Sequence, residues 1–195
     1  MAALPRDGAR RLVAVAGPPG SGKSTLAEAL VARLTAEGRA AVLMPMDGFH
    51  LDDRLLGPRG LLPRKGAPET FDAAGFAATL RRVRTEPAVL IPVFDRVREI
   101  AIAGAAEIAA GTDLVVVEGN YLLLDEEPWR QLAPLWSLSV FLDVAPAELE
   151  RRLTARWLGY GHAPEAAAEK ARGNDLPNAR RVLANRMAAD LTLEG

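Results

Sequence analysis

The stretch AVAGPPGSGKSTLAEAL, Ala14–Leu30, decides the fold expected of this chain. Gly17, Gly22, Lys23 and Ser24 satisfy the pattern GxxxxGK[ST], directly after an apolar run and at the start of a helical pattern. Glycines let backbone N–H groups converge on a phosphate at a helix N-terminus, where the helix dipole also favours negative charge. The alternative is an accidental glycine-rich turn. The stretch predicts a phosphate-binding loop that holds a nucleotide through Gly17, Pro18, Pro19, Gly20, Ser21, Gly22, Lys23, Ser24 and Thr25.

Length and composition bound what surrounds this loop. The chain has 195 residues, the size of one ordinary domain, and we expect a single domain over 1–195. Its net charge is -1, which favours no nucleic-acid or membrane partner, and no apolar run approaches a membrane span. The absence of cysteine excludes disulfides, thiolate catalysis and cysteine-based zinc sites. We therefore expect a cytoplasmic monomer or homodimer that acts on a small-molecule substrate.

Short apolar runs alternate with helical patterns along the chain. Strands are predicted at 11–17, 40–47, 113–119, 137–144 and 189–195, and helices at 24–38, 73–84, 127–135, 146–157 and 177–188. This alternation is typical of an α/β fold with a parallel sheet covered on both faces. The segment 48–70 is rich in glycine and proline and longer than a plain connection, so we expect it to be functional.

Two acidic residues end predicted strands at the edge where an α/β sheet binds its ligand. Asp47 ends the second strand and Glu118 lies at the end of the third. Mg²⁺ prefers oxygen ligands, so we assign Ser24 and Glu118 to the metal side. A hydroxyl that accepts a phosphoryl group needs a nearby carboxylate, so Asp47 is the candidate base. Because glycine follows each acid, a simple turn is the alternative for both.

Motifs along most of the chain carry a family resemblance. The series GPPGSGKST, MDGFH, RKGAPETFD, PVFDR, VVVEGNYLLL and ERRLTARWLGYG resembles the P-loop kinase family of phosphoribulokinase, uridine kinase and bacterial pantothenate kinase, over residues 11–190. The chain is most similar to the compact bacterial branch labelled nucleoside/nucleotide kinase-like or fructose transport system kinase. The resemblance implies a three-layer α/β/α P-loop kinase fold with a five-stranded parallel sheet of order 2-3-1-4-5 and a helical lid over about residues 151–175.

The same resemblance implies an activity. It implies ATP- and Mg²⁺-dependent phosphorylation of a hydroxyl on a sugar such as fructose, a nucleoside or a pantothenate-like compound. Asp47 matches the family's base and Glu118 its second strand-end acid. The chain lacks the extra segments of pantothenate kinases and phosphoribulokinases, and FDRVRE is not the tyrosine- and histidine-bearing form of uridine kinases. The acceptor therefore stays open.

Several polar residues are candidates for binding the acceptor. Carboxylates accept hydrogen bonds from hydroxyls, so Glu69 and Asp95 suit a sugar-like polyol. Solvated loop charges and a structural histidine are the alternatives. The full candidate set is Asp47, His50, Arg64, Lys65, Glu69, Asp95, Arg96 and Glu118.

The helix predicted from residue 146 carries the candidate lid arginines. In similar kinases arginines of this region close over the phosphates and stabilise the charge of the transition state. Arg152 and Arg156 are the catalytic candidates of this helix, and Arg151 lies beside them. The other two catalytic candidates are Asp47, as the base, and Lys23, which contacts the phosphates. Glu148 precedes Arg152 by four residues, so a surface ion pair is the alternative.

Two other functions compete with a small-molecule kinase. A nucleotide-dependent switch or assembly ATPase also uses a phosphate-binding loop, although neither an NKxD motif nor an LSGGQ signature occurs in the chain. A nucleoside monophosphate kinase shares the loop type, and MDGFH argues against that class. Turnover that depends on an acceptor separates these functions.

Overall fold

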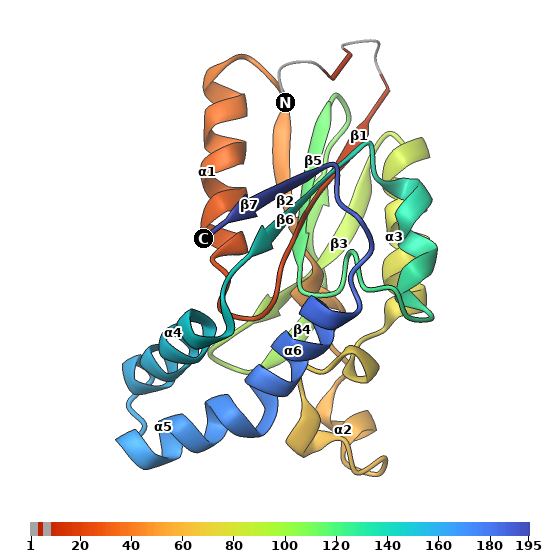
Figure 1. Cartoon of the computed structure of the whole chain (residues 1–195). Coiled ribbons are helices and arrows are strands. Elements are labelled where there is room, and N and C mark those ends of the chain that lie inside the picture. Colours follow the sequence, from red (N-terminus) through yellow and green to blue (C-terminus); the bar gives the residue numbers. More distant parts are fainter. Residues whose placement is uncertain (1–3, 6–8) are drawn as a thin grey trace.

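A computed structural model describes residues 4–5 and 9–195, and its centre is a five-stranded parallel sheet (Figure 1). The strands are β1 (Arg11–Ala16), β2 (Ala41–Pro45), β5 (Leu114–Gly119), β6 (Leu138–Asp143) and β7 (Leu191–Glu194). Their order is β2-β5-β1-β6-β7, and every neighbouring pair is parallel. Counted along the predicted strands this order is 2-3-1-4-5, so the expected fold class and sheet order are confirmed.

The central strand β1 sends alternate side chains into two separate apolar layers. Leu12, Ala14 and Ala16 join the larger hydrophobic cluster, whereas Val13 and Val15 join the cluster on the other face. All five are fully buried, as expected for a parallel strand with both faces covered. Helix α1 (Lys23–Ala36) covers the smaller cluster and α3 (Ala73–Thr85) the larger, and Figure 1 shows them on opposite sides of the sheet.

The remaining helices gather mainly beyond the carboxyl ends of the strands (Figure 1). They are α2 (Asp53–Leu56), α4 (Pro146–Gly159), α5 (Pro164–Lys170) and α6 (Leu176–Ala184), with 3-10 turns η1 (Met46–Phe49), η2 (Leu62–Arg64), η3 (Pro68–Thr70) and η4 (Trp129–Leu135) and the π turn η5 (Ala171–Asp175). The helix predicted at 127–135 is the 3-10 segment η4, which contains Pro134. The helix predicted to reach residue 188 ends at Ala184, after which Arg186 forms a bridge with Leu124.

A two-stranded antiparallel sheet was not expected from the sequence. It consists of β3 (Val89–Asp95) and β4 (Ile100–Ile108). Pro92 interrupts the first strand where the pairing register shifts, and proline argues against a strand in a sequence pattern. The turn lacks a glycine pair, and the Asp95 carboxylate instead accepts the N–H groups of Val97 and Arg98, while Glu99 adopts a φ of 54°.

At the opposite edge of the sheet, where the strands begin, the Arg10 side chain connects several chain segments by hydrogen bonds. The Arg10 guanidinium donates five hydrogen bonds to main-chain carbonyls that end α3, flank the hairpin and precede β5. The acceptors are the oxygens of Val83, Glu86, Pro87, Ala109 and Thr112. Because a guanidinium has five N–H donors, every one of them is used, and three chain segments meet at one side chain.

Replacing Arg10 by methionine removes all five donors and keeps much of the aliphatic bulk. We expect the free energy of unfolding to fall by about 2 kcal/mol, because carbonyls at a helix end lose charge-assisted partners. Urea unfolding measures it. Arg33→Met is the control, since Arg33 forms an exposed ion pair with Glu37 and the substitution is expected to cost under about 0.5 kcal/mol. Equal losses in the two variants would contradict the assignment.

Candidate active site

The loop between β1 and α1 presents open backbone N–H groups. Ser21 N–H donates to the Pro18 oxygen over 3.1 Å and closes a tight turn. Gly22, at a φ of 90°, precedes the first residue of α1, Lys23. No side chain caps the helix and no acid lies in its first turn. The free N–H groups and the positive end of the helix dipole therefore form a site for an anion.

Close packing explains the glycines of this loop. A Cβ on Gly17 would lie 2.7 Å from the Ser21 Oγ and 3.1 Å from the Leu142 oxygen. A Cβ on Gly20 would lie 3.0 Å from Leu153 of α4. The loop thus packs closely against β6 and α4, and a larger residue at either position would force its neighbours to shift.

A hydroxyl and a carboxylate meet at the mouth of the loop. Ser24 Oγ donates to Glu118 Oε2 over 3.1 Å, and Glu118 is only 5% exposed. Burial raises the pKa of Glu118, and the neighbouring Lys23 ammonium opposes this shift. Burial lowers the pKa of Lys23, against the charges of Glu118 and Asp47. These opposed shifts show that the ammonium and both carboxylates lie close together.

Asp47 stands beside Glu118 across two neighbouring strands. The strand β2 ends at Pro45, which pairs with Glu118, so Asp47 lies two residues further on in η1 and not in the strand. Gly48 is required here because a Cβ would come within 2.4 Å of the Pro92 oxygen in β3. The Asp47 carboxylate forms an ion pair with the Arg96 guanidinium from the hairpin turn.

His50 is fixed against the backbone of Asp47. Its Nδ1 lies 2.8 Å from the Asp47 carbonyl oxygen, and its ring lies 4.0 Å from the ring of Phe71 and 4.6 Å from that of Phe94. A carbonyl only accepts, so Nδ1 carries the proton and Nε2 keeps a lone pair. Burial lowers the pKa of His50, which keeps the ring neutral at pH 7.

The other acceptor candidates separate into two groups. Lys65 and Arg96 approach the Phe94 ring, at 5.7 and 5.9 Å from its centroid, and so belong with Asp47 and His50. Arg64 and Glu69 instead pair with each other at 2.9 Å. Glu69 also pairs with Arg181 at 3.0 Å.

Asp95 is occupied by the hairpin turn. It accepts the Val97 and Arg98 amides and the Arg98 guanidinium. The two carboxylates expected to bind a polyol, those of Glu69 and Asp95, therefore have internal partners in this structure.

Of the lid arginines, two face the phosphate loop. Arg152 donates to the Ser21 oxygen over 3.2 Å and also pairs with Glu148, as the surface-pair alternative expected. The charge of Arg156 lowers the pKa of Lys23, so it also lies near the loop. Arg151 pairs with Glu148 and is largely exposed.

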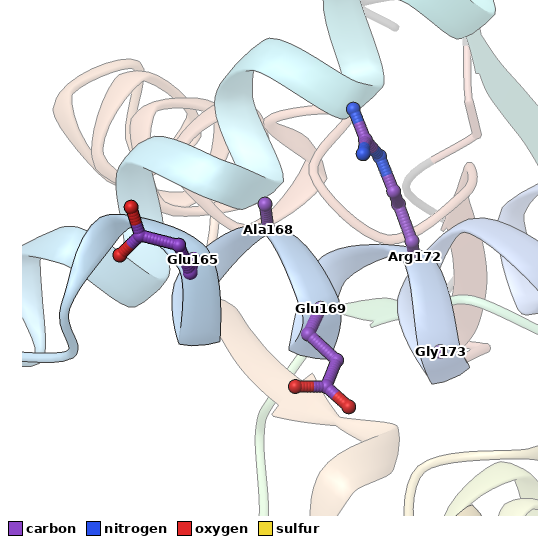
Figure 2. A pocket seen from close by; sticks show the side chains of 5 residues that line it. All are labelled: Glu165, Ala168, Glu169, Arg172 and Gly173. Atoms are coloured by element: carbon purple, nitrogen blue, oxygen red, sulfur yellow. The ribbon is translucent and has the colours of Figure 1, made fainter.

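A hollow of about 610 Å³ lies on the lid itself, away from the loop. Figure 2 shows its five lining residues on α5 and η5, with Arg172 extending toward α4, where it binds Glu150 at 2.8 Å. None of them is a sequence-predicted site residue; they are Glu165, Ala168, Glu169, Arg172 and Gly173. We therefore locate the candidate active site at the loop and the two acids, not in this hollow.

Sequence reasoning missed two polar residues that bind site residues. Asp175 accepts a hydrogen bond from Arg156 at 2.9 Å, and Arg181 bridges Glu69 and Glu126. The stretch GNDLPNARR contains both, but no local sequence pattern distinguishes them from solvated helix charges. Only the fold brings these residues to the site.

The parallel sheet, the loop and the strand-end acids define the class of P-loop nucleotide-binding proteins. A profile of the phosphoribulokinase/uridine kinase family matches residues 12–187, so the chain belongs to this family. It is 38% identical over 187 residues to the protein YggC of Escherichia coli (strain K12), covering 95% of this chain and 78% of that one.

Two further relatives show the same relationship. The solved structure of a "putative fructose transport system kinase" from Silicibacter sp. TM1040 has a TM-score of 0.94 and 54% identity, covering 97% of this chain and 92% of that one. The ATP-dependent kinase YFH7 of Lachancea thermotolerans is 32% identical over 198 residues, covering 78% of this chain and 56% of that one. The family resemblance read from the sequence is thereby confirmed.

The lowered pKa of His50 predicts a pH dependence of stability. Because the folded pKa lies below the ordinary value of 6.5, the unfolded chain takes up this proton first, and stability is lost as pH falls below about 6.5. We expect the wild type to lose more unfolding free energy between pH 7.5 and 5.5 than His50→Asn does. Urea unfolding at the two pH values measures the difference, and identical losses would contradict a buried, neutral His50.

Proposed function

We propose that the protein is an ATP-dependent kinase that transfers the γ-phosphate to a hydroxyl group of a small molecule. One observation carries the proposal: two carboxylates, Asp47 and Glu118, stand next to each other at the mouth of a phosphate-binding loop, and their surroundings differ. Glu118 is buried against Ser24, whereas Asp47 faces the hairpin and His50. A switch that only hydrolyses nucleotide needs no second carboxylate on an acceptor side.

The phosphate side is assigned first. The backbone N–H groups of the loop would bind the nucleotide phosphates, and Lys23 would neutralise their charge. Arg156 and Arg152, from the lid, add positive charge on the other side of the loop. Together they would stabilise the charge that spreads over the transferred group in the transition state.

Ser24 and Glu118 fit a magnesium ion. One hydroxyl and one carboxylate, already 3.1 Å apart, are the oxygen donors that Mg²⁺ accepts while it keeps several waters. In residues 4–5 and 9–195 no three histidine, cysteine, aspartate or glutamate side chains gather into a metal cluster, so a metal here would also depend on the phosphates. Bound there, the ion would neutralise phosphate charge and orient the transferred group.

The acceptor side is built around Asp47. Its carboxylate would take the proton of the acceptor hydroxyl and align the oxygen for in-line attack. Arg96 holds the carboxylate on one side, and His50 fixes the Asp47 backbone from the other. The His50 Nε2 lone pair and the Lys65 ammonium, both beside the Phe94 ring, would orient the acceptor.

A panel of acceptors tests the proposal. Purified protein with ATP and Mg²⁺ is assayed for ADP release with fructose and other hexoses, nucleosides, nucleoside monophosphates and pantothenate, with Lys23→Ala as the inactive control. Fructose comes first because of the kinase from Silicibacter named above. Stimulation by one compound identifies the acceptor class, whereas equal turnover with and without every compound favours a nucleotide switch.

Changing Asp47 to asparagine keeps its shape and removes the proton acceptor. We expect acceptor-dependent ADP release to fall by about 10²- to 10⁴-fold, with ATP affinity by calorimetry little changed. Asp52→Asn is the matched control, because asparagine also serves as the cap of α2 that Asp52 provides. Wild-type turnover by the Asp47 variant would remove it from the base role.

Changing Glu118 to glutamine should weaken the response to magnesium. We expect the Mg²⁺ concentration for half-maximal rate to rise by about 10-fold or more, because a charged ligand becomes neutral. A magnesium titration at saturating ATP measures it, and Glu37→Gln on the exposed face of α1 is the control. An unchanged titration would remove Glu118 from the metal side.

A further inference from the structure

The lid ends in a π turn. Helices α5 and α6 run as one continuous helix through Ala171–Asp175, where the hydrogen bonding widens to the π pattern. Such turns are rare and are frequently found at functional sites. Two adjacent residues of this turn, Asn174 and Asp175, make contacts in different directions.

Asn174 binds the loop on the acceptor side. Its side-chain amide donates to the Lys65 oxygen over 2.8 Å. Asn178, which is 2% exposed, donates to the Asn174 oxygen over 3.2 Å and so fixes which end of the amide faces Lys65. The neighbouring Gly66 N–H donates to Thr70 Oγ1, so the loop is itself ordered at the point of contact.

Asp175 binds the lid arginine. One carboxylate oxygen accepts the Arg156 guanidinium at 2.9 Å and the Trp157 indole N–H at 2.7 Å. The Asp175 side chain is only 15% exposed, so this ion pair is shielded more than an ordinary surface pair. Asp175 therefore sets the direction in which Arg156 extends.

Contacts continue from Lys65 to the candidate base. Its ammonium donates to Asp53 and to the Glu99 oxygen, both at 2.7 Å, and lies over the Phe94 ring. Phe94 packs on His50, which binds the Asp47 backbone. A series of contacts thus joins Asp47 to Arg156, and within it Asn174 and Asp175 connect the acceptor loop to the lid.

We propose that Asn174 and Asp175 are positioning residues that couple the acceptor loop, residues 62–67, to Arg156. This inference rests on the proposed function in one respect, that Arg156 faces the nucleotide phosphates. When bound phosphates order the Arg156 side chain, Asp175 is ordered with it, and Asn174 keeps its hydrogen bond to the Lys65 oxygen. In the opposite direction, an ordered acceptor loop keeps Arg156 in position to bind the phosphates. Coupling between two sites is reciprocal, so binding of nucleotide alone should change the order of the acceptor loop.

Hydrogen–deuterium exchange with and without magnesium and the non-hydrolysable ATP analogue AMP-PNP tests the coupling. In the wild type we expect the nucleotide to slow exchange of residues 62–67 by about fivefold or more, the low end of typical coupling between sites. In Asn174→Ala and in Asp175→Asn the response should fall below about twofold, with nucleotide affinity by calorimetry changed by less than about threefold. Thermal melting checks that each variant folds.

Arg172→Ala is the matched control. It removes a contact of the same π turn, the bond to Glu150, without touching Lys65 or Arg156, and should keep the wild-type response. A merely structural role for Asn174 would change exchange equally with and without nucleotide.

A wild-type response in Asn174→Ala, or no response of residues 62–67 in a wild type that binds nucleotide, would overturn the coupling. Failure of the kinase proposal would give a different result. Nucleotide would still slow the exchange of residues 62–67 in the wild type and not in Asn174→Ala, yet no compound of the acceptor panel would stimulate ADP release. That result supports the coupling and overturns the kinase.

Discussion

The structure depends on the burial of β1 at the centre of a parallel sheet. Both faces of this strand are covered, so its polar backbone is satisfied only by β5 and β6 on either side. The chain leaves β1 at the carboxyl edge of the sheet, through a turn that packs closely against its neighbours at Gly17 and Gly20. Because β2 and β5 end at the same edge, Asp47 and Glu118 arrive beside the loop without any direct sequence proximity.

Burial also decides how the charges at that edge behave. The ammonium of Lys23 and the carboxylate of Glu118 are each penalised by loss of water, and each reduces the penalty of the other. On the acceptor side the charges are more exposed and already paired: Asp47 with Arg96, Lys65 with Asp53. In the kinase proposed above, a polar acceptor would have to exchange partners with these pairs.

The sequence predicted the parts that local pattern controls. The loop of Gly17–Ser24 combines a fixed spacing with a strand before it and a helix after it, and the buried strands have uninterrupted apolar runs. It did not predict the β3–β4 hairpin, because Pro92 breaks the strand pattern and the Asp95 side chain replaces the usual glycine turn. The sheet order itself came from the family resemblance, not from periodicity.

Side-chain partners were the least predictable level. Glu69 and Asp95 look equally available for an acceptor in the sequence, yet each has internal partners supplied by the fold: Arg64 and Arg181 for the first, the hairpin turn for the second. Asp175 is a candidate positioning residue because it lies in the π turn and its carboxylate accepts a hydrogen bond from Arg156. Such pairings join residues up to 112 positions apart, and no local pattern encodes them.

Both ends of the lid are anchored by packing contacts, which limits how the lid can open. Leu153 of α4 packs on Gly20 of the loop, and α6 places Val182 in the larger hydrophobic cluster. Neither α4 nor α6 can therefore move away from the sheet without breaking buried contacts. In the proposed kinase, exchange of ADP for ATP would then proceed by rearrangement of side chains and of the connection between α4 and α5, which contains Gly161 at a φ of 83°. In the kinase proposed above, release of product past this connection would be a step that can limit the rate of repeated turnover.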